Sequence, residues 1–333
     1  MAASESVQPP HLSAPRRHRG RRSSVRSWRP RDQVVWLLAW LAGMLLCLVA
    51  GSIVVFLAVK GIGYLRPSLL VQSPSASVNQ SSSGGFLDPM IGTLTMALIG
   101  TVLATPLAVA TALWVVEYGR PRWLAAIVET SIELIAGTPD IVIGIFGLAL
   151  FQLGIFAPLS FRASGGGVYG RSFIATGLMA ALLALPLTYT AARNGLRAIP
   201  RHMREASYAL GKTRIATIRR VLLPSLRADV ATGAALGMGR IIGTTALVVL
   251  LLGGGLQIST EGSIPLLSFL RGTGSTLTGY ILNNSPAGEG NAPQKAYAAA
   301  FVLLLIILAL NGVVGRISRL GAGAAAGAGR LGR

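Results

Sequence analysis

The sequence predicts an all-α integral membrane protein with six transmembrane helices. Of its 333 residues, 52% are hydrophobic and only 12% are charged, whereas soluble proteins contain about 25% charged residues. Apolar stretches long enough to cross a bilayer recur along the chain. Lys and Arg concentrate in alternate connections between these stretches, as expected for a protein that crosses a membrane repeatedly.

The chain begins with a basic segment, followed by its first apolar stretch. Residues 1–33 are rich in Pro, Ser and Arg, with eight arginines between Arg16 and Arg31. Such a segment cannot build a hydrophobic core, so we predict a disordered cytoplasmic tail that sets topology or, alternatively, docks to anionic lipid. The residues from Val34 to Val59 carry no charge. They predict the first transmembrane helix, which we place at residues 34–63.

An extracytoplasmic loop and the second crossing follow. Residues 64–90 contain prolines, a Ser/Asn run and paired glycines, which indicate a loop. The second span is predicted from Ile91 to Val116, with Pro106 near its middle. A proline in a membrane helix is tolerated because neighbouring helices satisfy the freed carbonyl. A short turn from Glu117 to Trp123 is predicted to connect the second span to the third apolar region.

The third apolar region runs from Leu124 to Phe156 and contains acidic residues and a Gly-Thr-Pro sequence. Because proline disfavours a helical residue before it, we expect a helix, a break near residues 137–140 and a second helix. The fourth span is predicted from Phe173 to Ala192.

The second half contains a basic loop and two further spans. The loop at residues 193–227 holds nine Lys or Arg. A fifth span is predicted at Asp229–Leu252 and a sixth at Ala296–Val314. Residues 91–318 therefore form the predicted core, and the Gly/Ala-rich residues 319–333 form a flexible C-terminal tail.

Charge asymmetry predicts the orientation. With six spans, both termini lie on one side, together with the 117–123 turn and the 193–227 loop; that side carries 23 Lys or Arg, against five on the other. Basic residues are enriched in cytoplasmic loops, so we expect both termini and the 193–227 loop in the cytoplasm and the protein in the cell membrane.

Several classes of function are disfavoured. The net charge of +19 is distributed as topology signals rather than as a basic domain, which argues against nucleic-acid binding. The single cysteine, Cys47, excludes an intramolecular disulfide, and His11, His18 and His202 have no second ligand at metal spacing, so no metal site is expected. No phosphate-binding loop, nucleophile elbow or zinc-protease motif occurs, so catalysis has little support. If the chain takes part in active transport, the energy must come from another subunit or from an ion gradient.

The loop at residues 193–227 carries a specific pattern. Permease subunits of ABC importers share Glu-Ala-Ala, three residues, Gly, nine residues, Ile, one residue and Leu-Pro. Glu205, Ala206, Gly211, Leu223 and Pro224 match this pattern at the expected spacing, and Ser207 and Val221 are mild substitutions for its second Ala and its Ile. The alternative is an ordinary amphipathic surface helix that joins two spans. A glycine at a helix C-terminus and a proline at the next helix start predict a short helix, a turn and a second helix.

Over about residues 84–318, the chain resembles the PstA-type permease of phosphate ABC importers. Similar segments include Gly137–Phe146, Leu185-Pro186 and Ala296–Ala300. The resemblance implies a type I ABC importer permease fold with a cytoplasmic coupling helix. It also implies a homologous second permease, two ATP-binding subunits that use ATP in trans, and an extracytoplasmic phosphate-binding protein. This chain itself is then expected to bind no cofactor and to catalyse no reaction.

Three positions depart from the family pattern. Thr244 stands where the fifth span of the family usually has Glu, Thr190 stands where an Arg often follows the Leu-Pro of the fourth span, and Asp140 replaces a Ser. We include these three positions with Arg240 and Glu133 as candidate residues of the translocation pathway.

Arg240 has two interpretations. A charge within a span normally faces a cavity or a partner, so its guanidinium could contact a passing oxyanion. Alternatively, it forms an internal ion pair with Glu129, Glu133 or Asp140. Glu133 and Asp140 are seven residues apart and would share a helix face if the helix continued through Pro139; they could then line a cavity or form tertiary ion pairs.

The leading hypothesis is therefore a permease that forms half of a phosphate pathway, with the ATPase docked at Glu205–Pro224. Alternatives are an ABC permease for another oxyanion or small solute, an inactive paralogue or scaffold, and a secondary transporter that uses intramembrane acids. The last is disfavoured because no internal repeat of the spans is evident.

Overall fold

The computed structural model describes residues 29–75, 84–162, 166–255, 257–260, 264–285 and 293–328. The predicted basic tail lies outside these ranges except for its last five residues. The chain divides into two compact units, Met1–Val55 and Phe56–Arg333. The first contributes the N-terminal part of helix α1 (Pro30–Tyr64), and every other described element belongs to the second.

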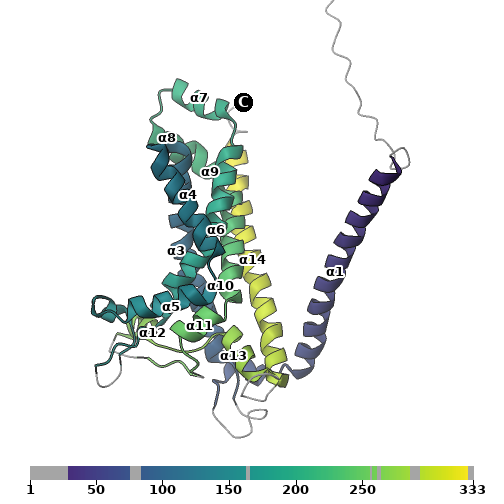
Figure 1. Ribbon diagram of the computed structural model, residues 1–333, viewed down its shortest axis with the longest axis vertical. Coiled ribbons are helices and arrows are strands. Elements are labelled where there is room, and N and C mark those ends of the chain that lie inside the picture. Colours follow the sequence, from purple (N-terminus) through teal and green to yellow (C-terminus); the bar gives the residue numbers. More distant parts are fainter. Residues whose placement is uncertain are drawn as a thin grey trace, which may run out of the picture. The chain divides into compact units, whose positions relative to one another are not determined.

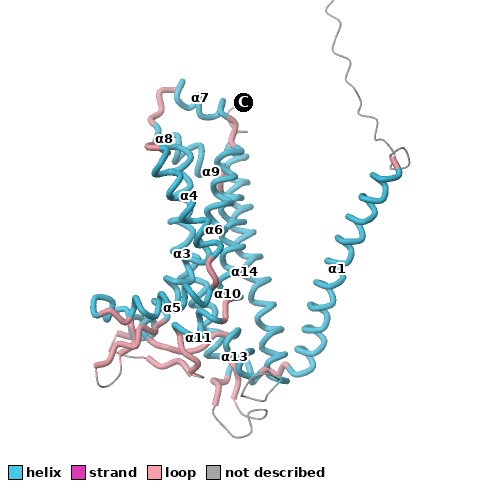
Figure 2. Tube along the Cα trace, viewed as in Figure 1, coloured by secondary structure: helices cyan, strands magenta, loops and turns pink. Residues whose placement is uncertain are grey.

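Regular structure in the described residues is helical (Figure 2). After α1 come α2 (Pro67–Val71), α3 (Leu87–Leu113), the π-helix η2 (Trp114–Tyr118), α4 (Arg122–Gly137), α5 (Asp140–Phe151), the 3₁₀-helix η3 (Gly154–Leu159), α6 (Phe173–Ala198), α7 (Arg201–Ala209), α8 (Arg214–Thr217), the π-helix η4 (Ile218–Leu222), α9 (Leu223–Ser225), α10 (Arg227–Gly243), α11 (Ala246–Leu251), α12 (Pro265–Arg271), α13 (Leu277–Asn284) and α14 (Pro293–Ala328). Two isolated β-bridges occur, but the described ranges contain no strand. The predicted all-α class is confirmed.

Four helical segments in the described residues are each long and apolar enough to cross a membrane: α1, α3 with η2, α6 and α14 as far as Arg316. The pair α4 and α5 makes a fifth crossing if it counts as one bent span. The four segments agree with the predicted first, second, fourth and sixth spans. Pro106 lies inside α3, which continues as a helix on both sides of it.

The predicted break in the third apolar region is confirmed. Helix α4 ends at Gly137, α5 begins at Asp140, and the two helices are bent by 107°. Glu133 and Asp140 therefore do not share one helix face, because the helix does not continue through Pro139.

The fifth span differs from the prediction of one continuous helix. Helix α10 ends at Gly243 and α11 begins at Ala246, with Thr244 in an extended conformation between them. Glycine and β-branched threonine are weaker helix formers than the residues around them. The carbonyl of Thr244, which is not bonded within a helix, accepts a hydrogen bond from the Thr278 hydroxyl at 3.4 Å.

Helix α6 forms the centre of the second unit. It packs most extensively against α3 and α10, and also against α4, α5 and α11. Close approach depends on small residues: a Cβ at Gly177 would clash with Ile99 of α3, and one at Gly237 would lie 3.1 Å from the Cβ of Ala184. Small residues at helix contacts are how membrane helices pack, because no hydrophobic effect drives them together in lipid.

The short helices of the second unit gather at its two ends (Figure 1). Helices α7, α8 and α9 lie at one end, and α11, α12 and α13 lie at the other. Helix α14 continues to Ala328, whereas the sequence predicts a core that ends at residue 318 and a flexible tail beyond it. Alanine, the best helix former, is frequent in this segment.

Candidate functional site

The connection between α6 and α10 folds as a short helix, a turn and further short helices. Helix α7 covers Arg201–Ala209, α8 and η4 follow, and α9 begins at Leu223 with Pro224 at its start. Proline suits this position because its missing N–H would have no partner in the first helical turn. The predicted helix, turn and second helix are confirmed.

Gly211 ends α7 in a Schellman motif. Its φ is +73°, its N–H donates to the Tyr208 carbonyl at 2.9 Å, and the Lys212 N–H donates to the Ser207 carbonyl at 3.2 Å. These two bonds satisfy carbonyls that the helix leaves without partners, and the left-handed conformation favours glycine. A Cβ at Gly211 would have no atom of the described chain within 4 Å. The turn therefore points into open space.

The seven residues of the pattern differ in exposure. Glu205, Ala206 and Gly211 are exposed, whereas Val221, Leu223 and Pro224 are partly buried. Ser207 is buried, and its hydroxyl lies 2.8 Å from the Thr217 hydroxyl, across the turn. The pattern thus supplies an exposed surface and an internal hydrogen bond that holds α7 against α8.

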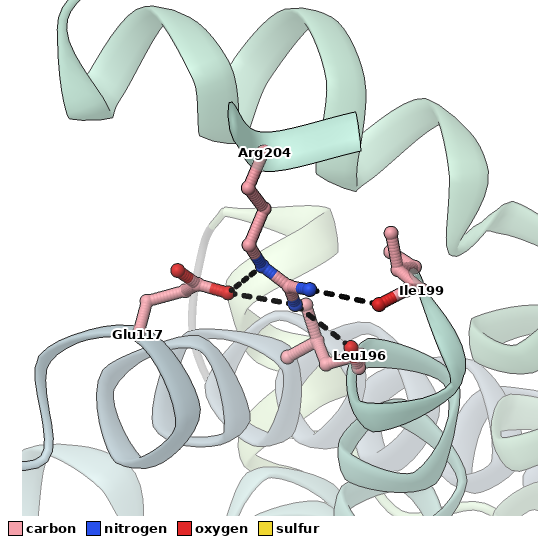
Figure 3. Close-up of polar contacts among 4 residues, drawn as sticks. All are labelled: Glu117, Leu196, Ile199 and Arg204. Carbon is pink, nitrogen blue, oxygen red and sulfur yellow. Dashed lines mark hydrogen bonds and ion pairs between the residues drawn. The ribbon is translucent and has the colours of Figure 1, made fainter. Parts of the chain in front are cut away.

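Arg204 ties α7 to the ends of two long helices (Figure 3). Its Nε and Nη2 both contact Oε1 of Glu117, each at 3.0 Å, while Nη1 donates to the Ile199 carbonyl at 2.8 Å and Nη2 to the Leu196 carbonyl at 2.9 Å. The two charged side chains are 18% and 7% exposed. One guanidinium therefore joins α7 to the C-terminal end of α6 and to η2, which continues α3.

Arg204 and Glu117 were not among the predicted site residues. The available signal was weak: Glu117 is an acid directly after an apolar span, and Arg204 precedes the Glu of the pattern. Their pairing follows from tertiary contact. Glu117 lies in η2, and π-helical turns occur frequently at functional sites.

A second cationic side chain links the turn to η2, beside an exposed apolar surface. The Arg214 guanidinium lies 4.3 Å from the centroid of the Tyr118 ring, which is a cation–π contact. Around the turn, Tyr208, Leu210 and Ile215 are 43%, 76% and 61% exposed. Exposed apolar side chains that are grouped on a surface favour contact with another protein.

Of the five candidate pathway residues, Arg240 and Asp140 are in direct contact. Nη2 of Arg240 contacts Oδ1 of Asp140 at 2.5 Å, and the two side chains are 45% and 27% exposed. Asp140 is the first residue of α5, directly after the 107° bend, and Arg240 lies one turn before the break between α10 and α11. The ion pair therefore joins two broken helices where each of them breaks.

The other candidates lie in different environments. Thr244 is buried in the break, and its hydroxyl has no hydrogen-bond partner in the described residues. Thr190 is exposed and donates to the Pro186 carbonyl at 2.8 Å. Glu133 is exposed on α4 and forms no ion pair within the described ranges. The structure thus brings Arg240 together with Asp140 and does not bring Glu133 to them.

Glu129, one of the three predicted partners of Arg240, belongs to a separate cluster. Its carboxylate pairs with Arg193, lies 3.6 Å from Arg197, and accepts a 3.5 Å hydrogen bond from the Tyr189 hydroxyl. This cluster joins α4 to α6 and leaves Asp140 as the carboxylate for Arg240. In the part of the chain that the structure describes, no cluster of three His, Cys, Asp or Glu could hold a metal ion.

Comparison with known proteins agrees with this architecture. Residues 104–320 match the family described as "Binding-protein-dependent transport system inner membrane component". The chain is 30% identical over 235 residues to the "Phosphate transport system permease protein PstA 1" of Mycobacterium tuberculosis, covering 69% of each chain. It is 29% identical over 238 residues to the "Phosphate transport system permease protein PstC" of Xylella fastidiosa, covering 67% of this chain and 69% of that one.

A further relative and a solved structure extend over more of the chain. The "Probable ABC transporter permease protein YqgH" of Bacillus subtilis is 29% identical over 304 residues, covering 86% of this chain and 94% of the relative. A bacterial alginate ABC transporter, solved with its pentasaccharide-bound periplasmic protein, superposes with a TM-score of 0.59 at 15% identity over 87% of this chain and 95% of the solved chain. That likeness shows the fold. The chain belongs to the family of inner membrane components of binding-protein-dependent transport systems.

Proposed function

We propose that this chain is a permease subunit of an ATP-driven phosphate importer, in which it forms half of the translocation pathway. The substrate is supported by relatives that are named phosphate transport permeases, both of the PstA and of the PstC type. The observation that carries the coupling role is the Arg204 anchor, which joins the exposed helix α7 to α6 and, through η2, to α3. A helix held in this way transmits a push from outside the chain to two spans.

In this proposal, partner proteins supply ATP hydrolysis, the other half of the pathway and the delivery of substrate. Two ATP-binding subunits hydrolyse ATP, one of them docks at the surface of Glu205, Ala206 and Gly211, and a homologous second permease completes the pathway. An extracytoplasmic phosphate-binding protein delivers the substrate. The 23 Lys or Arg on one side, against five on the other, support a cytoplasmic location for both termini and for α7.

The pathway side of this chain is the surface that carries Arg240 and Asp140. A charged side chain within a span normally faces a cavity or a partner, and Arg240 is 45% exposed in the isolated chain. Its guanidinium can form paired hydrogen bonds with an oxyanion that displaces Asp140. The carboxylate that pairs with Arg240 comes from Asp140 of α5, and Thr244 of the neighbouring break carries no charge.

Phosphate uptake in proteoliposomes tests the proposal. The chain is reconstituted with a second permease, the ATPase and the phosphate-binding protein, and ATP-dependent uptake of radiolabelled phosphate is measured with sulfate as the competing oxyanion. Uptake that requires ATP and is not suppressed by equal sulfate is expected. Uptake without ATP, or a preference for another solute, would contradict it.

A further inference from the structure

A basic pocket of about 500 Å³ lies beside α7 and shares Glu205 with the proposed docking surface. It is formed by η2, the end of α6, α7 and the start of α8. We refer to it as the basic pocket; its lining residues are Val116, Glu117, Arg197, Ile199, Arg201, Arg204, Glu205 and Arg214. Four arginines and two glutamates give it a formal charge of +2.

The two acidic residues of the pocket differ, because Glu117 forms an ion pair with Arg204 and Glu205 forms none in the described residues. Glu117 is paired with Arg204, which also donates to the Leu196 and Ile199 carbonyls. Glu205 forms no ion pair in the described part of the chain. Arg204 and Glu117 are thus a neutral, fixed wall of the pocket.

The other three arginines keep donors for a ligand. The Arg214 guanidinium lies over the face of the Tyr118 ring, a contact that uses none of its N–H groups in a hydrogen bond. The Arg197 side chain is 55% exposed, and its Nη2 lies 3.6 Å from Oε1 of Glu129, which forms a shorter ion pair with Arg193. Arg201 makes no ion pair with any described residue. One arginine comes from each of α6, α7 and α8.

The charge distinguishes this pocket from two others in the chain. The pocket beside Gly253 contains a single arginine, Arg171, whose Nε donates to the Leu250 carbonyl. The pocket between α10 and α14 contains no charged residue. Clustered arginines commonly bind phosphate groups, because each planar guanidinium can donate two parallel hydrogen bonds to phosphate oxygens.

We propose that the basic pocket is a second anion site that binds a phosphate group through Arg197, Arg201 and Arg214. The phosphate group comes either from free phosphate or from a lipid headgroup. Bound there, it links the end of α6, α7 and α8 to one another and restrains the coupling helix. If the chain imports phosphate, as proposed above, free phosphate in the cytoplasm then slows its own import.

Binding to the isolated full-length chain tests the site without any assumption about transport. The chain is purified in detergent without lipid, and binding of radiolabelled inorganic phosphate is measured by equilibrium dialysis at about 0.15 M salt, where exposed charges are largely screened. The variant Arg201→Gln with Arg214→Gln is compared with Arg219→Gln with Arg220→Gln. The second pair removes the same charge from exposed positions of η4 that do not line the pocket.

We expect the pocket variant to bind phosphate about tenfold or more weakly than wild type, because each lost charge-assisted hydrogen bond is worth about a factor of ten, and the η4 variant to bind as wild type. A parallel arm uses nanodiscs of phosphatidylcholine with or without phosphatidylglycerol. Retention of phosphatidylglycerol by wild type, lost in the pocket variant only, assigns the site to a headgroup. Equal binding in both variants, or none of either ligand, overturns the site.

Hydrogen exchange of α7 measures the restraint. Saturating phosphate, or the headgroup lipid if that arm binds, should slow exchange in residues 201–211 of wild type and leave the pocket variant unchanged. In proteoliposomes that carry out transport, phosphate enclosed in the compartment that α7 faces should reduce ATP-driven uptake by the wild-type complex, compared with proteoliposomes that enclose no phosphate. Binding without altered exchange overturns the restraint. A chain that binds phosphate in the pocket but transports another solute contradicts the proposed function and leaves the site in place.

Discussion

The guanidinium of Arg204 and the carboxylate of Glu117 are 87 residues apart in sequence and form a largely buried ion pair, with 3.0 Å between Nη2 and Oε1. The pair joins α7 to the end of the α3–η2 helix, and two backbone carbonyls at the α6 end accept further hydrogen bonds from Arg204. Because one side chain of α7 makes all these contacts, a movement of α7 away from either span breaks hydrogen bonds of Arg204. This is the mechanical connection on which the proposed coupling depends.

Replacing Arg204 with Ala should release α7 from the spans. Glu117 would then be left buried without its partner, and breaking a buried pair in this way costs about 3–5 kcal/mol when both charges are fully desolvated. Because Arg204 is 18% exposed, we expect a cost nearer the lower end. Hydrogen exchange in residues 199–211 should accelerate at least about a hundredfold, since each 1.4 kcal/mol is a factor of ten.

The controls for this change are Glu117→Ala and the double variant. If the two residues act as a pair, the double variant should be no worse than the more damaging single one, as in a double-mutant cycle. Effects that simply add would show that Arg204 holds α7 through its backbone contacts and not through Glu117.

Substitutions at Gly211 should separate turn formation from docking. The φ of +73° costs an ordinary residue about 1–2 kcal/mol, and Asn tolerates it better than most. No described atom lies within 4 Å of a Cβ at this position, so a large side chain meets only an external partner. Gly211→Asn should keep co-purification of the ATPase, whereas Gly211→Trp should insert normally and lose both the ATPase and uptake. Retention of both by the Trp variant would refute docking at this turn.

Arg240 should matter for transport more than for stability. Arg240→Gln is expected to lower phosphate uptake at least about tenfold at equal membrane levels, because a charge-assisted contact with the anion is lost. Asp140→Asn also removes the ion pair but leaves the cation in place, so uptake should survive in that variant. Equal losses in the two variants, or uptake insensitive to Arg240→Gln, would assign the pair a purely structural role.

Two glycines of α10 provide a matched test of the helix packing. A Cβ at Gly233 would lie 2.8 Å from the Cβ of Ala191 and 3.0 Å from the Cα of Thr188, whereas one at Gly239 would meet nothing within 4 Å. Gly233→Ala should therefore destabilise the purified chain by about 1–3 kcal/mol through overpacking. Gly239→Ala should stabilise it slightly, by up to about 1 kcal/mol, because alanine is the better helix former. Thermal unfolding of the two variants distinguishes them, and equal effects would contradict the close contact of α10 with α6.

Features that depend on neighbouring residues could be predicted from the sequence. The positions of four spans follow from uncharged stretches, and the bend between α4 and α5 follows from Gly137-Thr138-Pro139. The turn at Gly211 is closed by bonds to residues 207 and 208. By contrast, the break at Thr244 was not predicted, because an apolar composition does not show whether a helix is continuous.

The sequence by itself determined the all-α membrane class, the charge asymmetry and the residue pattern of the 205–224 loop, since each is set by composition or by spacings of a few residues. The tertiary structure decided which charges meet. Three acids were possible partners for Arg240. Glu129 forms an ion pair with Arg193, and the 107° bend separates the helix of Glu133 from that of Asp140, which pairs with Arg240. Arg204 and Glu117 meet for the same physical reason: an ion pair requires atoms within about 4 Å, and only helix packing brings residues that are distant in sequence so close.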